Sequence, residues 1–195
     1  VSKDRVVRPF EWGLDWIPPN GLPPGAPAER ALENWVGHVM ADTDAFFTPE
    51  PTTEYTLSAA GPDGYRTLSF PSAFRTPHPE NNTVYCRVVL ASSKRPTRAA
   101  VLVLPQWNSD PGGHVGLCRL LAMNGMTALR LSLPYHDRRM PPELQRADYI
   151  VSSNVARTVQ VCRQAVLDAR RAIAWLAQQG FDRIGILGTS LGSCL

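Results

Sequence analysis

The feature that most constrains the fold is the final stretch of the chain, where an apolar run ends in the pattern GxSxG. Residues 184–187 have the composition of a short buried strand, and residues 188–192 (Gly-Thr-Ser-Leu-Gly) follow directly. In this pattern the serine lies on a sharp turn from a strand to a helix, where only glycine leaves room two residues to either side. Because such a turn lifts a hydroxyl above the sheet, Ser190 is a candidate nucleophile.

Two other interpretations of these glycines stay open. A glycine-rich turn between a strand and a helix can pack closely without any chemistry, and a nucleotide-binding turn uses the same geometry with its amides facing phosphate. The spacing matches neither GxGxxG nor a Walker loop, which requires a lysine before its Ser or Thr. A long amphipathic pattern before the strand favours the nucleophile turn.

The hydrophobic pattern predicts an α/β fold. Residues 99–104 are apolar on both faces, as in a central strand covered by helices on each side. Further strands are predicted at 55–59, 65–70, 84–90, 127–133 and 183–187, and helices at 113–124 and from about 152 to 180. We therefore expect a mostly parallel sheet flanked by helices, with antiparallel strands at its N-terminal side.

The longest predicted helix has one apolar stripe. It starts near the capping candidates Ser152, Ser153 and Asn154 and stops at Gly180. Its stripe, with steps of four and three residues, consists of Val155, Val159, Cys162, Val166, Ala169, Ile173 and Leu176. We expect this stripe to face the sheet.

Proline divides the chain into two parts. Twelve of the 18 prolines precede residue 80, including Pro18-Pro19 and Pro23-Pro24, so residues 1–53 are predicted to form a largely irregular arm. One helix, over residues 28–47, is expected within this arm. Residues 54–195 form the second part, an α/β domain.

Composition narrows the classes of partner. The net charge of +3 comes from scattered arginines with no dense basic run, so we expect no nucleic-acid partner. No apolar stretch is long enough for a membrane span, and residues 1–5 lack the apolar core of a signal peptide, which favours a cytoplasmic protein. The four cysteines are widely spaced without a CxxC pair, so we expect reduced thiols, no metal and no cofactor.

From residue 55 to 195 the order of elements, ending in the turn at Ser190, resembles the α/β-hydrolase superfamily. The resemblance implies that Ser190 is the catalytic nucleophile and that the backbone N–H of Leu191 is one donor of an oxyanion hole. The second donor would come from the loop after the third strand of that fold. We align Trp107 with this second donor by its position in the loop, and Gln106 and Asn108 are the alternative candidates.

The same resemblance places residues 133–139 near the pocket, so Tyr135 and His136 join Gln106 and Asn108 as possible pocket residues. The neighbours His136 and Asp137 invite comparison with a catalytic dyad. Neighbours in sequence do not easily present an imidazole to Ser190 while the acid orients it from behind, so we favour a structural His-Asp-Arg cluster that holds the loop. His114 and Cys118, one helical turn apart, are too few for a metal site.

The resemblance implies a serine hydrolase that acts on an ester or related acyl bond of a small molecule. In that fold the acid and the histidine follow the serine, so both are expected beyond residue 195, and residues 54–195 are expected to be the N-terminal portion of a truncated α/β-hydrolase domain. The 195 residues alone should show little turnover and expose the last strand as an apolar edge. A non-catalytic binding protein of the same fold, or a peptidase or thioesterase with the same triad, stays an alternative. The oligomeric state is not predicted.

Overall fold

A six-stranded sheet with the order β1-β2-β3-β5-β4-β6 forms the centre of the molecule. The computed structural model describes residues 7–18, 25–92 and 97–195, so Pro19, Pro23 and Pro24 and the first residues of the chain lie outside the described part. The strands are β1 (Thr56–Leu57), β2 (Arg66–Pro71), β3 (Thr83–Val89), β4 (Ala99–Leu104), β5 (Thr127–Leu131) and β6 (Arg183–Gly188). The α-helices are α1 (Ala28–Ala41), α2 (Thr43–Phe47), α3 (Val115–Met123), α4 (Val155–Gln178) and α5 (Leu191–Cys194), with 3-10 turns η1 (Leu14–Trp16), η3 (Pro79–Asn82) and η4 (Asp137–Arg139).

The sheet is mixed and open. β1, β2 and β3 are antiparallel neighbours, and β3 is antiparallel to β5. β4 runs parallel to both β5 and β6. The predicted α/β class with antiparallel N-terminal strands is therefore confirmed, and β6 forms one edge of the sheet.

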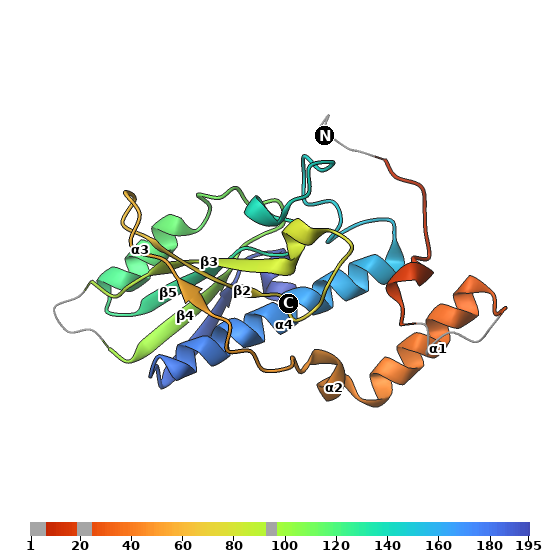
Figure 1. Ribbon diagram of the computed structural model, residues 1–195, viewed down its shortest axis with the longest axis horizontal. Helices are drawn as coiled ribbons and strands as arrows, with labels where there is room; N and C mark the ends of the chain where they lie inside the picture. The colour runs from red at the N-terminus through yellow and green to blue at the C-terminus, as the bar shows by residue number, and fades with distance from the viewer. Residues whose placement is uncertain (1–6, 19–24, 93–96) are drawn as a thin grey trace.

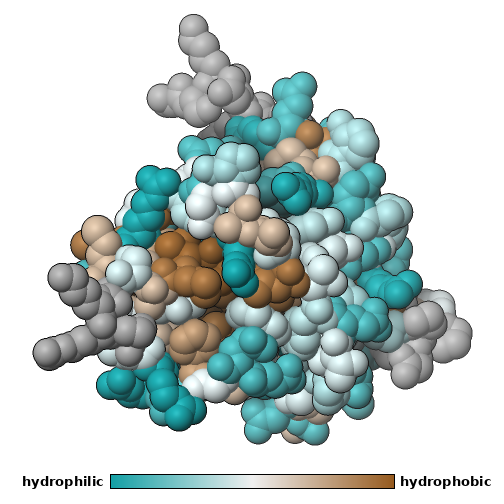
Figure 2. Space-filling model, turned by 60° about the vertical axis from the view of Figure 1, so that its left-hand side comes forward, coloured by the Kyte–Doolittle hydropathy of each residue, from teal (hydrophilic) through white to brown (hydrophobic). Residues whose placement is uncertain are grey.

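Helices cover the sheet on two faces (Figure 1). α4 runs across one face, where its residues Val161, Ala165 and Leu176 join the main core with Leu68 of β2 and Leu102 of β4. α3 packs on the other face through a smaller apolar cluster of Val103, Cys118 and Ala128. Apolar side chains also reach the surface, and Figure 2 shows apolar residues gathered in one area of the face in view, surrounded by hydrophilic ones.

The buried face of α4 differs from the predicted stripe. Val159 is 38% exposed, whereas Val161, Ala165 and Ala172 are fully buried. The reason is that polar side chains share the buried face with the apolar ones: Gln160, Gln164, Asp168 and Arg171 are all buried. The apolar pattern alone therefore misplaced the buried face by part of a turn.

The N-terminal arm contains two helices where one was predicted. α1 ends at Ala41, because the backbone of Asp42 (φ −147°, ψ 78°) is not helical and breaks the helical hydrogen-bonding pattern. The Asp42 carboxylate then accepts a 2.9 Å hydrogen bond from the N–H of Ala45, which starts α2. An aspartate that caps a helix, within a stretch whose hydrophobic pattern looks continuous, is thus the sequence signal for two separate helices.

The arm lies along α4. The Gln160 side-chain amide donates to the backbone oxygen of Trp16 at 2.9 Å, and the Arg163 Nε donates to the backbone oxygen of Phe46 at 2.7 Å. An apolar cluster around Ile17, Trp35 and Ala156 lies between arm and helix. Polar side chains of α4 thus satisfy backbone oxygens of the arm at Trp16 and Phe46.

A fully buried ion pair links α4 to the loops at the carboxyl end of β5. Arg139 Nη2 lies 2.8 Å from Asp168 Oδ2, and both side chains are 0% exposed. Ser72 donates to the other oxygen of Asp168 at 2.8 Å, and Arg139 also donates to the backbone oxygens of Asn81 and Ser132. Because both members of this pair are fully buried, removal of one leaves an unpaired charge in the core.

We expect Arg139→Leu to lower the free energy of unfolding by about 3–5 kcal/mol, because Asp168 then loses its counter-ion inside the core. The matched control is Arg98→Leu, since Arg98 pairs with Asp182 at 3.3 Å on the surface. That exposed pair should contribute less than about 1 kcal/mol. Urea denaturation of both variants measures the difference, and equal losses would contradict the prediction.

Candidate active site

Ser190 lies on a strained turn at the carboxyl end of β6. Its φ of 50° and ψ of −117° lie outside the regions that non-glycine residues prefer. The residue is exposed, and α5 begins directly after it at Leu191. Strained backbone of this kind persists only where the surrounding structure holds it, and it is concentrated at functional sites.

The two glycines of GxSxG hold the turn by close backbone packing. A Cβ at Gly188 would lie 2.7 Å from the Cα of Ser193 and closer still to the backbone of Gly192. A Cβ at Gly192 would lie 2.7 Å from the backbone oxygen of Pro105 and would also collide with the backbone oxygen of Leu104. The predicted need for glycine on both sides of Ser190 is therefore present in the structure.

We expect Gly192→Ala to destabilise the protein by about 1–3 kcal/mol or more, because the added methyl group meets backbone atoms rather than a flexible side chain. Gly116 in α3 is the control, since a Cβ there has no neighbour within 4 Å. Gly116→Ala should leave stability unchanged or raise it by up to about 1 kcal/mol. Thermal unfolding followed by circular dichroism compares the two, and a harmless Gly192→Ala would show that the contact is not required.

The loop after β4 lies against this turn. The N–H of Thr189 donates to the backbone oxygen of Leu104 at 3.1 Å, which joins the turn to the last residue of β4. Leu191 is the first residue of α5, so its backbone N–H has no partner within the helix. The loop that contains Gln106, Trp107 and Asn108 continues directly from this contact point.

The structure distinguishes the three candidates for the second donor in part. The N–H of Asn108 donates to His136 Nε2 at 2.8 Å, so this amide is already used. The indole N–H of Trp107 donates to the backbone oxygen of Ala147 at 2.9 Å, and the Arg146 guanidinium lies 4.8 Å from its ring centroid. These contacts fix the Trp107 side chain and leave its backbone N–H, like that of Gln106, as a candidate donor.

His136 is buried and joins two loops. Its Nε2 accepts from Asn108, so the neutral ring has its proton on Nδ1, which lies 2.9 Å from the backbone oxygen of Pro134 and donates to it. Burial lowers the pKa of His136, with smaller contributions from the nearby Arg130 and Arg139 charges. The Asp137 carboxylate bonds to Arg130 and Ser132, so His136 and Asp137 do not form a dyad with each other.

This lowered pKa predicts a loss of stability in mild acid. In the unfolded chain the imidazole has the ordinary His pKa of 6.5, and in the folded protein its pKa is lower. At a pH between these two values the unfolded chain binds a proton that the folded protein does not. The free energy of unfolding therefore falls as the pH drops below about 6.5. His136→Asn, which retains an acceptor for the Asn108 N–H without a titrating group, should lose less stability between pH 7 and pH 5. Urea denaturation at both pH values measures the slopes, and parallel slopes for the two proteins would refute this role.

Arg130 on β5 is a site residue that the sequence analysis missed. Its guanidinium donates to the backbone oxygens of Gly113 at 2.7 Å and Asp110 at 2.9 Å, and to Asp137 Oδ2 at 2.8 Å. The side chain is almost fully buried. One cation thus holds both the loop after β4 and the loop after β5. The one sign of this role in the sequence is that an arginine lies inside an otherwise apolar strand.

His114 is a second residue with an unexpected position. Its Nε2 lies 3.0 Å from the Oγ1 of Thr189, the residue immediately before Ser190. The backbone of His114 has a positive φ of 66° at the start of α3. Burial first, and then the Arg130 charge, lower its pKa. The imidazole therefore braces the turn from the loop after β4, a contact that residue spacing cannot show.

Tyr135 is placed inside the protein rather than on an accessible wall. It has a positive φ of 63° and is fully buried, and its phenol oxygen lies 2.9 Å from His78 Nδ1. Burial raises the pKa of Tyr135 to about 12.

In the described ranges no three His, Cys, Asp or Glu side chains gather as metal ligands, and no helix there is long and apolar enough to cross a membrane.

Known structures share this arrangement of sheet and helices. A candidate acetyl xylan esterase from Bacteroides fragilis matches with a TM-score of 0.58 and 15% identity, over 84% of this chain and 49% of that one. An acetyl xylan esterase from Paenibacillus sp. R4 matches with a TM-score of 0.50 and 17% identity, over 76% of this chain and 49% of that one. The chain thus spans about half the length of these proteins.

Protein-family models and curated protein sequences give no match to this chain. Identities of 15% and 17% bear on the fold alone. The strand order and the two helical layers agree with that likeness. The chain has the fold of the α/β-hydrolase superfamily.

Proposed function

We propose that the protein to which these residues belong is a serine hydrolase that cleaves an ester or related acyl bond in a small molecule. The observation that carries the proposal is the turn at Ser190: an exposed serine with positive φ, held between β6 and α5 by two glycines that no other residue can replace without collision. Structural neighbours described as acetyl xylan esterases support an ester as the substrate class.

In the proposed reaction Ser190 Oγ attacks the acyl carbon and loses its proton to a histidine beyond residue 195, which an acid residue orients. The carbonyl oxygen gains negative charge as the new bond forms. The backbone N–H groups of Leu191 and Trp107 donate to this oxygen, and a donor of this kind typically contributes about 3–4 kcal/mol to the transition state. Collapse of the intermediate expels the alcohol, which takes the proton from the histidine, and water then hydrolyses the acyl-enzyme.

In this proposal the polar residues that precede Ser190 in the sequence hold the turn and the neighbouring loops in place. His114 holds Thr189, and Arg130 and His136 hold the loops after β4 and β5, so none of them needs to exchange a proton with the substrate. The backbone N–H of Trp107 is the preferred second donor, because Asn108 has already donated its own to His136. We further propose a cytoplasmic location and no nucleic-acid partner, in line with the composition.

Labelling of the full-length protein by a fluorophosphonate probe tests this function. We expect Ser190→Ala to abolish labelling and hydrolysis of a short-chain p-nitrophenyl ester, because the nucleophile is lost. Ser193→Ala is the matched control, since Ser193 lies one helical turn away and its hydroxyl only donates to the backbone oxygen of Ser190. That control should remain labelled. Labelling that persists in Ser190→Ala would place the nucleophile elsewhere, and a wild-type protein without labelling would favour a non-catalytic binding protein.

A further inference from the structure

A cleft lies over β2 and β3, away from Ser190. It has a volume of about 670 Å³, and its lining includes Tyr65, Thr67, Tyr85, Arg87, Asp137 and Arg138. Thr67 and Arg87 are paired across β2 and β3, and they alternate with Leu68 and Cys86, which join the core beneath α4. The cleft therefore opens on the face opposite α4. β5 and β4 stand between β3 and β6, and the described lining of the cleft contains no residue of β6 or of the turn at Ser190.

Two buried polar atoms of the lining have no hydrogen-bond partner among the described residues. One is Asp137 Oδ1, on a side chain that is 9% exposed, and the other is the phenol oxygen of Tyr65, a residue that is 8% exposed. The second oxygen of Asp137 already accepts from Arg130 and Ser132. An unsatisfied buried carboxylate oxygen is costly, so the geometry at Asp137 calls for a donor from a bound molecule.

Two arginines at the same cleft offer unused donors. The Arg87 guanidinium lies 5.8 Å from the ring centroid of Tyr65, and the Arg138 guanidinium lies 5.5 Å from that of Tyr85. In the described part of the chain neither guanidinium has an acidic partner within salt-bridge distance. A guanidinium near the face of an aromatic ring still has N–H groups that can donate to a carboxylate or phosphate.

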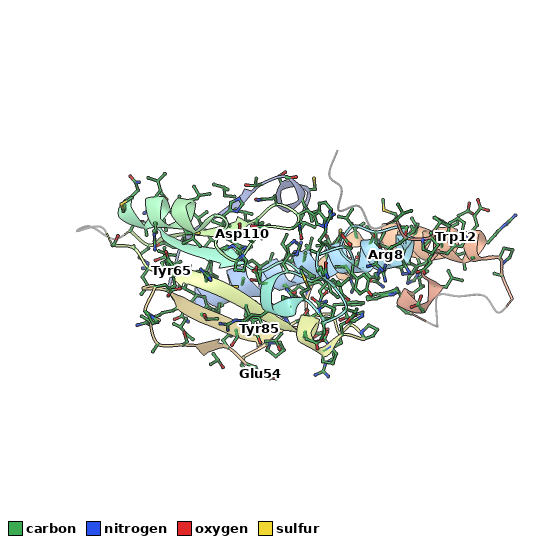
Figure 3. All side chains as sticks on the ribbon, turned by 90° about the horizontal axis from the view of Figure 1, so that it is seen from above. Arg8, Trp12, Glu54, Tyr65, Tyr85 and Asp110 are labelled. Carbon is green, nitrogen blue, oxygen red and sulfur yellow. The ribbon has the colours of Figure 1, made fainter. Side chains whose placement is uncertain are left out.

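The charge around the cleft is positive on balance. Arg119 stacks on Tyr65 at 5.1 Å and Arg130 pairs with Asp137, so four arginines stand against the carboxylates of Asp63 and Asp137. Figure 3 shows Tyr65 and Tyr85 on the side of the molecule away from Arg8 and Trp12 of the arm. The cleft thus combines anion-binding groups with a buried acceptor that a hydroxyl group of the same ligand can satisfy.

We propose that this cleft binds a small polyol that carries one anionic group. The anion lies between Arg87 and Arg138, and one hydroxyl group of the ligand donates to Asp137 Oδ1. The Tyr65 phenol bonds to a further hydroxyl. A phosphorylated polyol and a carboxylated one share this chemistry, and they differ only in the anion that the two guanidinium groups hold.

Isothermal titration of the full-length protein with four probes tests the site: sorbitol 6-phosphate, gluconate, sorbitol and inorganic phosphate. We expect sorbitol 6-phosphate or gluconate to bind at least about tenfold more tightly than sorbitol and inorganic phosphate, and the tighter of the two identifies the anion. Absence of binding by both anionic polyols would overturn the proposal. Equal binding of sorbitol would also overturn it, because the arginines would then contribute nothing.

Variants locate the site. Arg87→Gln and Tyr65→Phe should each weaken binding of the anionic polyol, the first by about tenfold. The exposed Arg138→Gln gives a second test of the anion contact, should Arg87→Gln fail to fold as judged by circular dichroism. Arg66→Gln, which removes the same charge from β2 outside the cleft, should leave affinity unchanged. An equal loss of affinity in Arg66→Gln would show general charge attraction and refute the site. Ser190→Ala should bind the anionic polyol as tightly as the wild type does, whatever its hydrolytic activity.

Discussion

The contact between the backbone of Gly192 and the backbone oxygens of Leu104 and Pro105 determines the rest of the candidate active site. Backbone atoms cannot move aside as side chains do, so this contact fixes where α5 starts relative to the end of β4. The Thr189 N–H bond to Leu104 reinforces it. With these two contacts in place, Ser190 connects β6 to α5 through its unusual backbone conformation.

Around this contact the loops are held by polar side chains that are almost fully buried. Arg130 bonds to the backbone after β4 and to Asp137 after β5, and neutral His136 receives the Asn108 N–H. Each of these bonds is short and shielded, so it contributes more than a similar bond on the surface. These bonds hold the loops after β4 and β5 in place, and under the proposed function the chemistry is left to Ser190 and to backbone N–H groups.

Features that depend on local sequence were predictable, and those that depend on long-range polar contacts were not. The strand at 99–104, a helix cap among residues 152–154 and the glycines around Ser190 each follow from local backbone requirements. The structure contains all three, with Asn154 as the cap. Asp42 divided a predicted helix, and the polar face of α4 shifted its buried side away from Val159. The contacts of His114 with Thr189, and of Arg130 with Asp137, join residues whose partners no spacing rule identifies.

The pairing of β6 with β4 has a consequence for the order of folding. In the described sheet β6 is bonded only to β4, and the whole of α4 separates these two strands along the chain. Long loops of this kind close late, because their entropy is lost before their contacts form. This separation along the chain favours late assembly of the serine turn, after β2 and β3 have paired across a much shorter loop. A local opening of β6 alone would remove the geometry of the turn.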